Sequence, residues 1–90
     1  MSVTVQLSPS LANYVNDIRS ITVTGKTVGE CLIDLVFQFP SLSEIIFSNH
    51  GKLQNYISVF LNKRSAYPSE LTKPARDGDT IDLVLVISGG

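Results

Sequence analysis

The sequence predicts an α+β domain in which a mixed β-sheet packs against one main helix. Three observations lead to this fold class. Segments near both ends alternate apolar and polar residues with the two-residue period of a β-strand, and a central segment has a helical period instead. A sheet with one apolar face also needs a second layer to cover that face. The central helix is expected to supply this layer.

The length and composition indicate one compact unit. Ninety residues suffice for a single hydrophobic core but not for a core plus a separate catalytic domain. Apolar residues make up 43% of the chain and charged residues 17%, whereas a disordered chain would be far more polar. The sequence contains no internal repeat, low-complexity tract or linker. Residues 1–90 are therefore expected to form one domain.

The first strand is expected around Val3, Val5 and Leu7, which alternate with polar residues. The same alternation returns at Ile21 and Val23. The connection between the two segments is polar and contains a proline near its start. We therefore expect the two strands to pair as a hairpin joined by a long loop.

The main helix is expected from Val28 to Phe39, and Pro40 ends it. Thr27 and Glu30 have the spacing of a capping box, in which each residue satisfies an amide group of the first helical turn. After Pro40 the same spacing recurs and predicts a second, shorter helix. The apolar face of the main helix consists of Val28, Leu32, Leu35, Val36 and Phe39.

Strand alternation resumes in two segments after the helices, and the turn signal Asp77-Gly78-Asp79 introduces the second of them. The order strand, strand, helix, strand, strand is the outline of the β-grasp, or ubiquitin-like, fold. The helix is expected to pack on Val5, Val23, Val59 and Leu83. The inward-facing residues of the two later strands are expected to be Ile57, Val59 and Leu61, and Ile81, Leu83 and Leu85.

The charge pattern argues against nucleic acid and membrane partners. Seven basic residues are scattered among eight acidic ones, so they form no basic footprint. The longest apolar stretch, Leu83 to Ile87, is far shorter than the roughly 18 to 20 residues that cross a bilayer. The single Cys31 cannot form an internal disulfide, and the first residues lack the features of a signal peptide. We expect a cytoplasmic protein.

The polar residues form no recognisable catalytic or metal-binding constellation. Cys31 lies on or beside the apolar face of the helix, as a small buried residue would. His50 is the one histidine and has no nearby cysteine with which to bind zinc or form a catalytic pair. Asp77, Asp79 and Asp82 lack the spacing of a calcium loop and are better explained as a turn and a solvated strand residue. We expect neither a bound metal nor an enzyme.

The chain resembles the MoaD/ThiS family of ubiquitin-like sulfur carriers, which includes the small subunit of molybdopterin synthase. The resemblance rests on the β-grasp pattern over nearly the whole chain, on Asp77-Gly78-Asp79 before the last strand, and on the terminal Gly89-Gly90. Without side chains, two glycines can enter a narrow channel with backbone angles closed to other residues. A flexible tail from about residue 87 is therefore expected to reach a partner's active site.

The resemblance implies a carrier whose chemistry takes place at Gly90. A partner adenylyltransferase of the ubiquitin-activating type would use ATP to adenylate the Gly90 carboxylate, and Ser88 and Gly89 would be recognised with it. A sulfur donor, either a sulfurtransferase or a cysteine desulfurase, would then convert the adenylate to a thiocarboxylate. A synthase such as the large subunit of molybdopterin synthase would accept the sulfur. No cofactor is expected to bind the carrier itself.

Strand parity predicts a docking patch for such partners. If the inward residues of the last strand face the helix, Val84 and Val86 point away from it, and so does Phe60 on the neighbouring strand. An apolar patch beside a reactive tail suits a carrier that partners must recognise. The alternatives are that these are ordinary scattered surface residues, or that a slipped register turns them inward.

Several destinations for the sulfur stay open: molybdopterin, thiamine, cysteine or another metabolite. Molybdopterin is placed first because it is the commoner assignment. Many molybdopterin carriers have a Pro-Pro pair before the tail, where this chain has Leu85-Val86. The segment from Gly51 to Asn62 instead resembles the cysteine-pathway carriers.

Two other classes of function also fit the sequence. A protein modifier would join Gly90 to lysine amines of target proteins, as ubiquitin does. A plain interaction module would have Gly89 and Gly90 only as an inert, frayed end.

Overall fold

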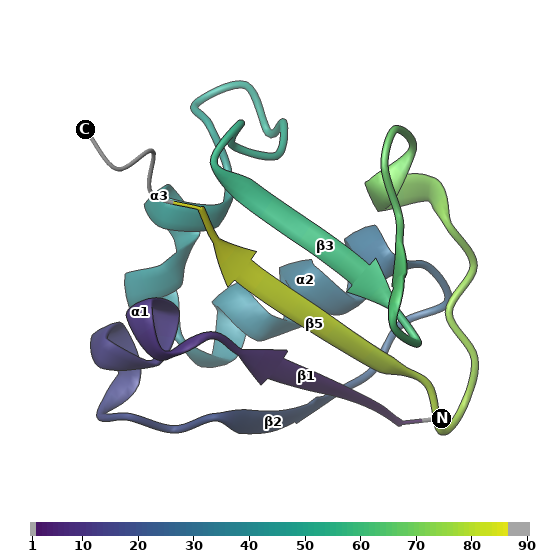
Figure 1. Ribbon diagram of the computed structural model, residues 1–90, viewed down its shortest axis with the longest axis horizontal. Coiled ribbons are helices and arrows are strands. Elements are labelled where there is room, and N and C mark those ends of the chain that lie inside the picture. The colour runs from purple at the N-terminus through teal and green to yellow at the C-terminus, as the bar shows by residue number, and fades with distance from the viewer. Residues whose placement is uncertain (1, 87–90) are drawn as a thin grey trace.

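The computed structural model describes residues 2–86 and has a five-stranded mixed sheet in the order β2-β1-β5-β3-β4 (Figure 1). One main helix, α2, packs against the sheet, and shorter helices connect the strands. The elements in chain order are β1 (Val3–Leu7), α1 (Pro9–Ala12), η1 (Asn13–Val15), β2 (Ser20–Val23), α2 (Val28–Gln38), η2 (Pro40–Leu42), α3 (Ser43–Ile46), β3 (Ile57–Leu61), β4 (Arg64–Ser65), η3 (Glu70–Thr72) and β5 (Thr80–Leu85).

The two central strands of the sheet come from opposite ends of the chain. β1 pairs antiparallel with β2 and parallel with β5, so that Val5 lies opposite both Ile21 and Ile81. β3 pairs antiparallel with β5 and places Val59 opposite Leu83. The β1/β2 hairpin and the α+β β-grasp fold predicted from the sequence are both confirmed.

Helix α2 begins at the predicted N-cap Thr27, but only half of the predicted capping box forms, because the Glu30 side chain bonds the Lys26 amide and not the Thr27 amide. The Thr27 hydroxyl accepts a hydrogen bond from the Glu30 amide at 3.1 Å, and the Glu30 carboxylate accepts one from the Lys26 amide at 2.8 Å. These bonds satisfy amide groups that have no partner within the helix. The helix ends at Gln38, with Phe39 as its C-cap residue, one position before the predicted end.

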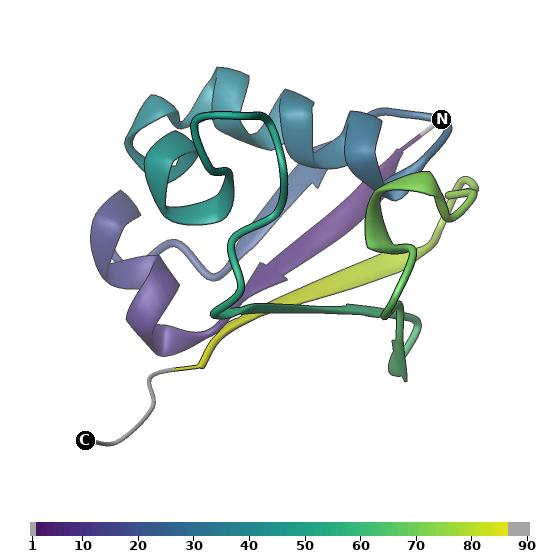
Figure 2. The same ribbon diagram turned by 90° about the horizontal axis from the view of Figure 1, so that it is seen from above.

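The hydrophobic core lies between α2 and one face of the sheet (Figure 2). All nine residues predicted to form the helix-to-sheet contact belong to this core. Val36 and Phe39 are partly buried at its margin, because they lie near the end of the helix. The predicted residues that are fully buried are Val5, Val23, Val28, Leu32, Leu35, Val59 and Leu83.

The connection between β1 and β2 differs from the predicted polar loop. Residues Pro9–Ala12 form a helical turn, and Leu11, Ala12 and Val15 are buried in the core. A proline at the first helical position is favourable because its missing amide hydrogen has no partner there in any case. One or two turns are too short to show a helical period, so the apolar residues of this segment were not recognised as core.

The short strand β4 was also not predicted. It follows β3 through a two-residue turn at Asn62 and Lys63, both of which have a positive φ, 51° and 71°. This backbone conformation matches the twist of a tight hairpin, and asparagine tolerates it better than most residues. The hairpin extends the sheet beyond β3 by only the residue pairs Phe60 with Ser65 and Leu61 with Arg64.

The Asp79 carboxylate joins the two sides of the turn before β5 by hydrogen bonds. These bonds affect how the free energy of unfolding depends on pH in acid. The carboxylate accepts hydrogen bonds from the Asn62 side chain at 3.0 Å and the Arg76 amide at 2.8 Å. The Asn62 bond, and next the Arg76 amide, lower the pKa of Asp79 below its ordinary value of 3.8. A lowered folded-state pKa stabilises the fold above the ordinary value, and this contribution is lost as pH falls from 3.8 through the lowered pKa.

We therefore expect Asp79→Asn to remove part of the dependence of stability on pH in that acid range. Urea unfolding at a series of pH values would measure it in both proteins. The same slope of unfolding free energy against pH below 3.8 in wild type and variant would contradict the assignment.

Candidate functional site

The end of β5 is held from both sides. The Val86 amide donates a hydrogen bond to the Tyr56 carbonyl at 2.7 Å, and the Leu85 amide donates one to the Ser8 hydroxyl at 3.3 Å. The Ser8 amide in turn donates to the Leu83 carbonyl at 3.0 Å. The sheet thus fixes the chain up to residue 86. The predicted tail from about residue 87, with Ser88, Gly89 and Gly90, lies outside the described residues.

The face of the sheet opposite α2 carries the predicted patch. Ile81 and Leu83 are fully buried on the helix side, so the alternate residues of β5 point the other way. Val84 is half-buried there and Val86 is 51% exposed, while Phe60 is half-buried on β3. The parity is as predicted, and the register is not slipped. A docking role for the three residues stays a prediction.

This face is hollowed beside the patch. A hollow of about 320 Å³ is lined by Phe60 and Val84 together with polar residues of β1 and β5. Charged groups border it: Asp82 pairs with Lys63 at 3.2 Å, and the Arg19 side chain donates to the Leu7 carbonyl at 2.7 Å. The hollow therefore combines apolar and charged residues, as protein contact surfaces commonly do.

Cys31 is a core residue, as predicted. It is fully buried, and burial raises the pKa of its thiol above the ordinary value, with the nearby carboxylates of Asp34 and Glu30 adding to the effect. A thiol with a raised pKa is a poor nucleophile, because the thiolate is the reactive form. Cys31 therefore contributes packing and not chemistry.

The three aspartates considered as a cation site have hydrogen-bond or ion-pair partners within the fold, and His50 stands apart from them. Asp77 accepts a hydrogen bond from the Ser2 amide at 2.7 Å, and Asp79 and Asp82 have the partners described above. His50 lies in an exposed turn. Over residues 2–86 no group of three or more His, Cys, Asp or Glu side chains could hold a metal ion. None of the helices in that part of the chain is long and apolar enough to span a membrane.

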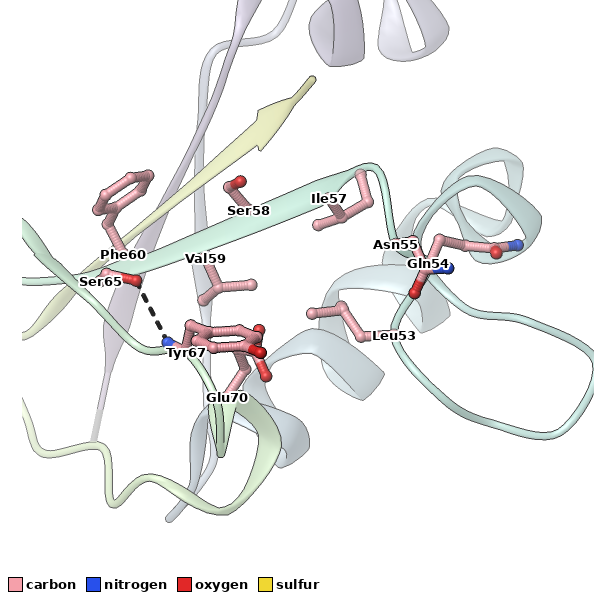
Figure 3. Close-up of a pocket in the computed structure, with 10 residues that line it drawn as sticks. All are labelled: Leu53, Gln54, Asn55, Ile57, Ser58, Val59, Phe60, Ser65, Tyr67 and Glu70. Atoms are coloured by element: carbon pink, nitrogen blue, oxygen red, sulfur yellow. Dashed lines mark hydrogen bonds between the residues drawn. The ribbon is translucent and has the colours of Figure 1, made fainter. Parts of the chain in front are cut away.

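A second hollow, on the side of β3 that β4 covers only in part, was not predicted (Figure 3). It measures about 360 Å³, and we call it the edge hollow. Tyr67 and Glu70, which line it, come from the proline-containing link that the sequence pattern left without structure. No periodic signal marks them, because their position depends on how this link packs against β3. The residues that line the edge hollow are Leu53, Gln54, Asn55, Ile57, Ser58, Val59, Phe60, Ser65, Tyr67 and Glu70.

Known proteins similar to this chain include both carriers and modifiers. The sulfur carrier protein CysO of Mycobacterium tuberculosis is 26% identical over the full length of both chains. SAMP1, the small archaeal modifier protein 1 of Haloferax volcanii, is 30% identical, covers all of both chains and superposes with a TM-score of 0.89. One chain in the crystal structure of the Amycolatopsis orientalis BexX/CysO complex is 25% identical to this chain. The match covers 98% of this chain and 99% of that chain, with a TM-score of 0.83.

The family assignment rests on most of the chain. The model of the ThiS family matches residues 12–90, from the first short helix through β5 to the terminal glycines. This span includes α2, the patch residues Phe60, Val84 and Val86, and the Gly89-Gly90 pair. The chain therefore belongs to the ThiS family, as the sequence predicted.

Proposed function

We propose that this protein carries sulfur as a thiocarboxylate at Gly90, loaded and unloaded by partner proteins. The observation that carries the proposal is the family match, which extends through the β-grasp domain to residue 90. The curated relatives named sulfur carrier protein CysO match the chain over its full length and support the same role. The chain supplies the acyl group, and the partners supply the catalysis.

The proposed chemistry balances without a catalytic residue of the carrier. A Gly90 carboxylate oxygen attacks the α-phosphorus of ATP in a partner adenylyltransferase, which forms the acyl-adenylate and releases pyrophosphate. A sulfur nucleophile from a sulfurtransferase or cysteine desulfurase then attacks the acyl carbon and displaces AMP. When a persulfide delivers the sulfur, a thiol must reduce the acyl disulfide to free the thiocarboxylate. In the sulfur-accepting synthase the thiocarboxylate sulfur bonds to the acceptor, and water then attacks the acyl carbon, which releases the sulfur-containing product and returns the Gly90 carboxylate.

The geometry of β5 suits a reactive end that must enter another protein. Val86 is hydrogen-bonded to Tyr56, the residue just before β3, and Gly90 follows Val86 by four positions. Four extended residues span at most about 13 to 14 Å. A partner that holds the patch of Phe60, Val84 and Val86 can therefore take Gly90 into a site within that distance of the sheet, with Ser88 and Gly89 in the approach channel.

The patch has the right size to offset the ordering of the tail. Fixing a residue costs roughly 1 to 2 kcal/mol in backbone entropy, hence on the order of 4 to 8 kcal/mol for four residues. The two glycines offer little apolar surface in return. Burying an apolar side chain contributes about 1.5 to 3 kcal/mol, so three anchors such as Phe60, Val84 and Val86 compensate on the same scale.

The comparisons favour one destination of the sulfur over the molybdopterin assignment. The curated relatives matched over the full length are named CysO, and the BexX/CysO complex is a further similar structure. This chain also has Leu85-Val86 where many molybdopterin carriers have two prolines. We therefore place a cysteine-pathway acceptor first, with molybdopterin and thiamine synthases as the alternatives to be tested beside it.

Intact-mass analysis tests the carrier proposal directly. With ATP, a sulfur donor and the adenylyltransferase from the same cell, the chain should gain the mass difference between sulfur and oxygen. Omission of ATP should prevent the gain. An unchanged mass, with an adenylyltransferase shown to load a known carrier, would overturn the proposal.

A second candidate function, protein modification, is favoured by the similarity to SAMP1, the small archaeal modifier protein 1. In that case the Gly90 adenylate would react with a lysine amine of a target and form an amide. Conjugates of this chain that resist reducing agent in cell extracts would support modification. A population that consists only of free thiocarboxylate would support the carrier alone.

A further inference from the structure

The outer edge of β3 is only partly closed by the short strand β4. The Ala66 amide donates to the Val59 carbonyl at 2.9 Å, and the Ile57 amide donates to the Gln54 carbonyl at 3.1 Å. Within residues 2–86 the Ile57 carbonyl and the Val59 amide have no main-chain partner. Both groups point away from β5, because alternate residues of β3 pair with it. The edge therefore offers one acceptor and one donor side by side.

The opposite edge of the sheet, on β2, is treated differently. The Gln38 side chain donates to the Thr22 carbonyl at 3.0 Å, and the Asp34 carboxylate accepts from the Thr24 amide at 2.9 Å. Two side chains of α2 thus bond one outward carbonyl of β2 and the amide just after its end. Proteins commonly cover sheet edges in this way to prevent unwanted pairing. The β3 edge lacks such a cover at Ile57 and Val59.

The edge hollow lies beside these two free groups. Figure 3 shows Leu53, Val59 and Tyr67 pointing toward the same space between β3 and the link that follows β4. Val59 is buried, whereas Tyr67 is 76% exposed. The Ser65 hydroxyl accepts a hydrogen bond from the Tyr67 amide at 3.3 Å, and this bond holds the start of the link that forms one side of the hollow. The hollow therefore has both polar and apolar walls and is open to solvent.

One charged group, Glu70, lines the hollow. The one ion pair found among the described residues joins Lys63 to Asp82. The Glu70 carboxylate therefore has no cationic partner in that part of the chain. The Tyr67 ring lines the same space, and an aromatic face attracts a cation that lies within about 6 Å of it. Leu53, which is only partly buried, provides apolar surface for the stem of a long side chain. These features together suit a lysine or arginine side chain.

We propose that the β3 edge binds an extended segment of a partner protein that carries a basic side chain. The segment donates an amide to the Ile57 carbonyl and accepts a hydrogen bond from the Val59 amide, as an added strand does. Its basic side chain enters the edge hollow toward Glu70. Phe60 lines both the edge hollow and the hollow on the outer face, so the segment continues the docking face.

The negative charge of Glu70 favours a basic segment of a partner over the C-terminal residues of this chain as the ligand of the edge hollow. Ile87-Ser88-Gly89-Gly90 has no basic side chain to place beside Glu70. The edge site also makes no use of the Gly90 carboxylate. Binding at the edge and loading of sulfur are therefore tested by separate experiments, and either can fail without the other.

A peptide titration of the full chain tests the proposal. The probe is a blocked six-residue peptide of alternating valine and threonine with one central lysine, and its matched control has glutamate in place of the lysine. In ¹⁵N NMR spectra the lysine peptide should shift the Val59 amide most strongly and slow its hydrogen exchange. Glu70→Gln should weaken binding of the lysine peptide by about two- to fivefold, and it should not weaken binding of the glutamate peptide, because it removes a like charge.

A change in the peptide alone tests the main-chain bonds, so it does not depend on the folding of a variant. Methylation of the peptide nitrogen that donates to Ile57 should weaken binding by about three- to tenfold. Equal binding of the lysine and glutamate peptides would overturn the proposal, as would shifts centred on β2. Shifts of the Val59 amide with protein concentration alone would show that a second copy occupies the edge, and would overturn it too.

Discussion

Leu35→Ala is expected to lower the free energy of unfolding by about 2 to 5 kcal/mol, the usual cost of a leucine-to-alanine change in a core. Leu35 is fully buried in the last part of α2 and belongs to the cluster that joins the helix to the sheet. The surrounding strands fix their spacing through main-chain hydrogen bonds, so they cannot move in to fill the space. Urea unfolding followed by circular dichroism measures the loss.

Ile33→Ala is the matched control on the same helix. Ile33 is 61% exposed, and alanine has a higher helix propensity than isoleucine, so the two effects oppose each other. We expect a change within about 0.5 kcal/mol of wild type. Similar losses for Leu35→Ala and Ile33→Ala would show that α2 does not present its predicted face to the sheet.

The main elements could be predicted because each has a period that is complete within its own segment. Val3, Val5 and Leu7 define one face of β1 without reference to any other strand. Thr27 and Glu30 mark the start of α2 through contacts between near neighbours in the chain. Such local patterns fix the number and order of the long elements, and the β-grasp topology follows from that order.

The short elements could not be predicted, because tertiary contacts determine them. The Tyr67 and Glu70 side chains reach β3 only because the link between β4 and β5 returns along that edge and packs its helical turn η3 near α2. Gly29 allows this close approach: a Cβ atom there would lie 2.7 Å from the Leu71 carbonyl oxygen. A glycine inside a helix indicates a close contact, but not which segment makes it.

The patch could be predicted from the sequence but the edge hollow could not, because only the patch follows from a local pattern. Parity along β5 placed Val84 and Val86 on the outer face, because the buried positions of that strand were clear. The edge hollow depends on which groups of β3 stay unpaired, and this depends on the length of β4. The Gly90 chemistry was argued from family resemblance, and the family match now supports it as a proposal.

Deletion of Gly90 and substitution of the patch are expected to separate reaction from recognition. Without Gly90 the chain should form no thiocarboxylate, because the carboxylate would end one residue short of the nucleotide, while much of the binding to the adenylyltransferase should remain. Phe60→Ala and Val84→Asp should instead weaken that binding by about tenfold or more each, since each removes an apolar anchor of about 1.5 to 3 kcal/mol.

Thr22→Asp controls for the added charge, because Thr22 is exposed on the same sheet but lies on β2, away from the patch. Calorimetric titration with the adenylyltransferase measures binding, intact-mass analysis measures loading, and urea unfolding confirms that each variant is folded. We expect Thr22→Asp to bind and load like wild type. If folded Phe60→Ala/Val84→Asp protein bound as tightly as wild type, the docking surface would lie elsewhere. If the Gly90 deletion were still loaded, the reactive carboxylate would have been assigned to the wrong residue.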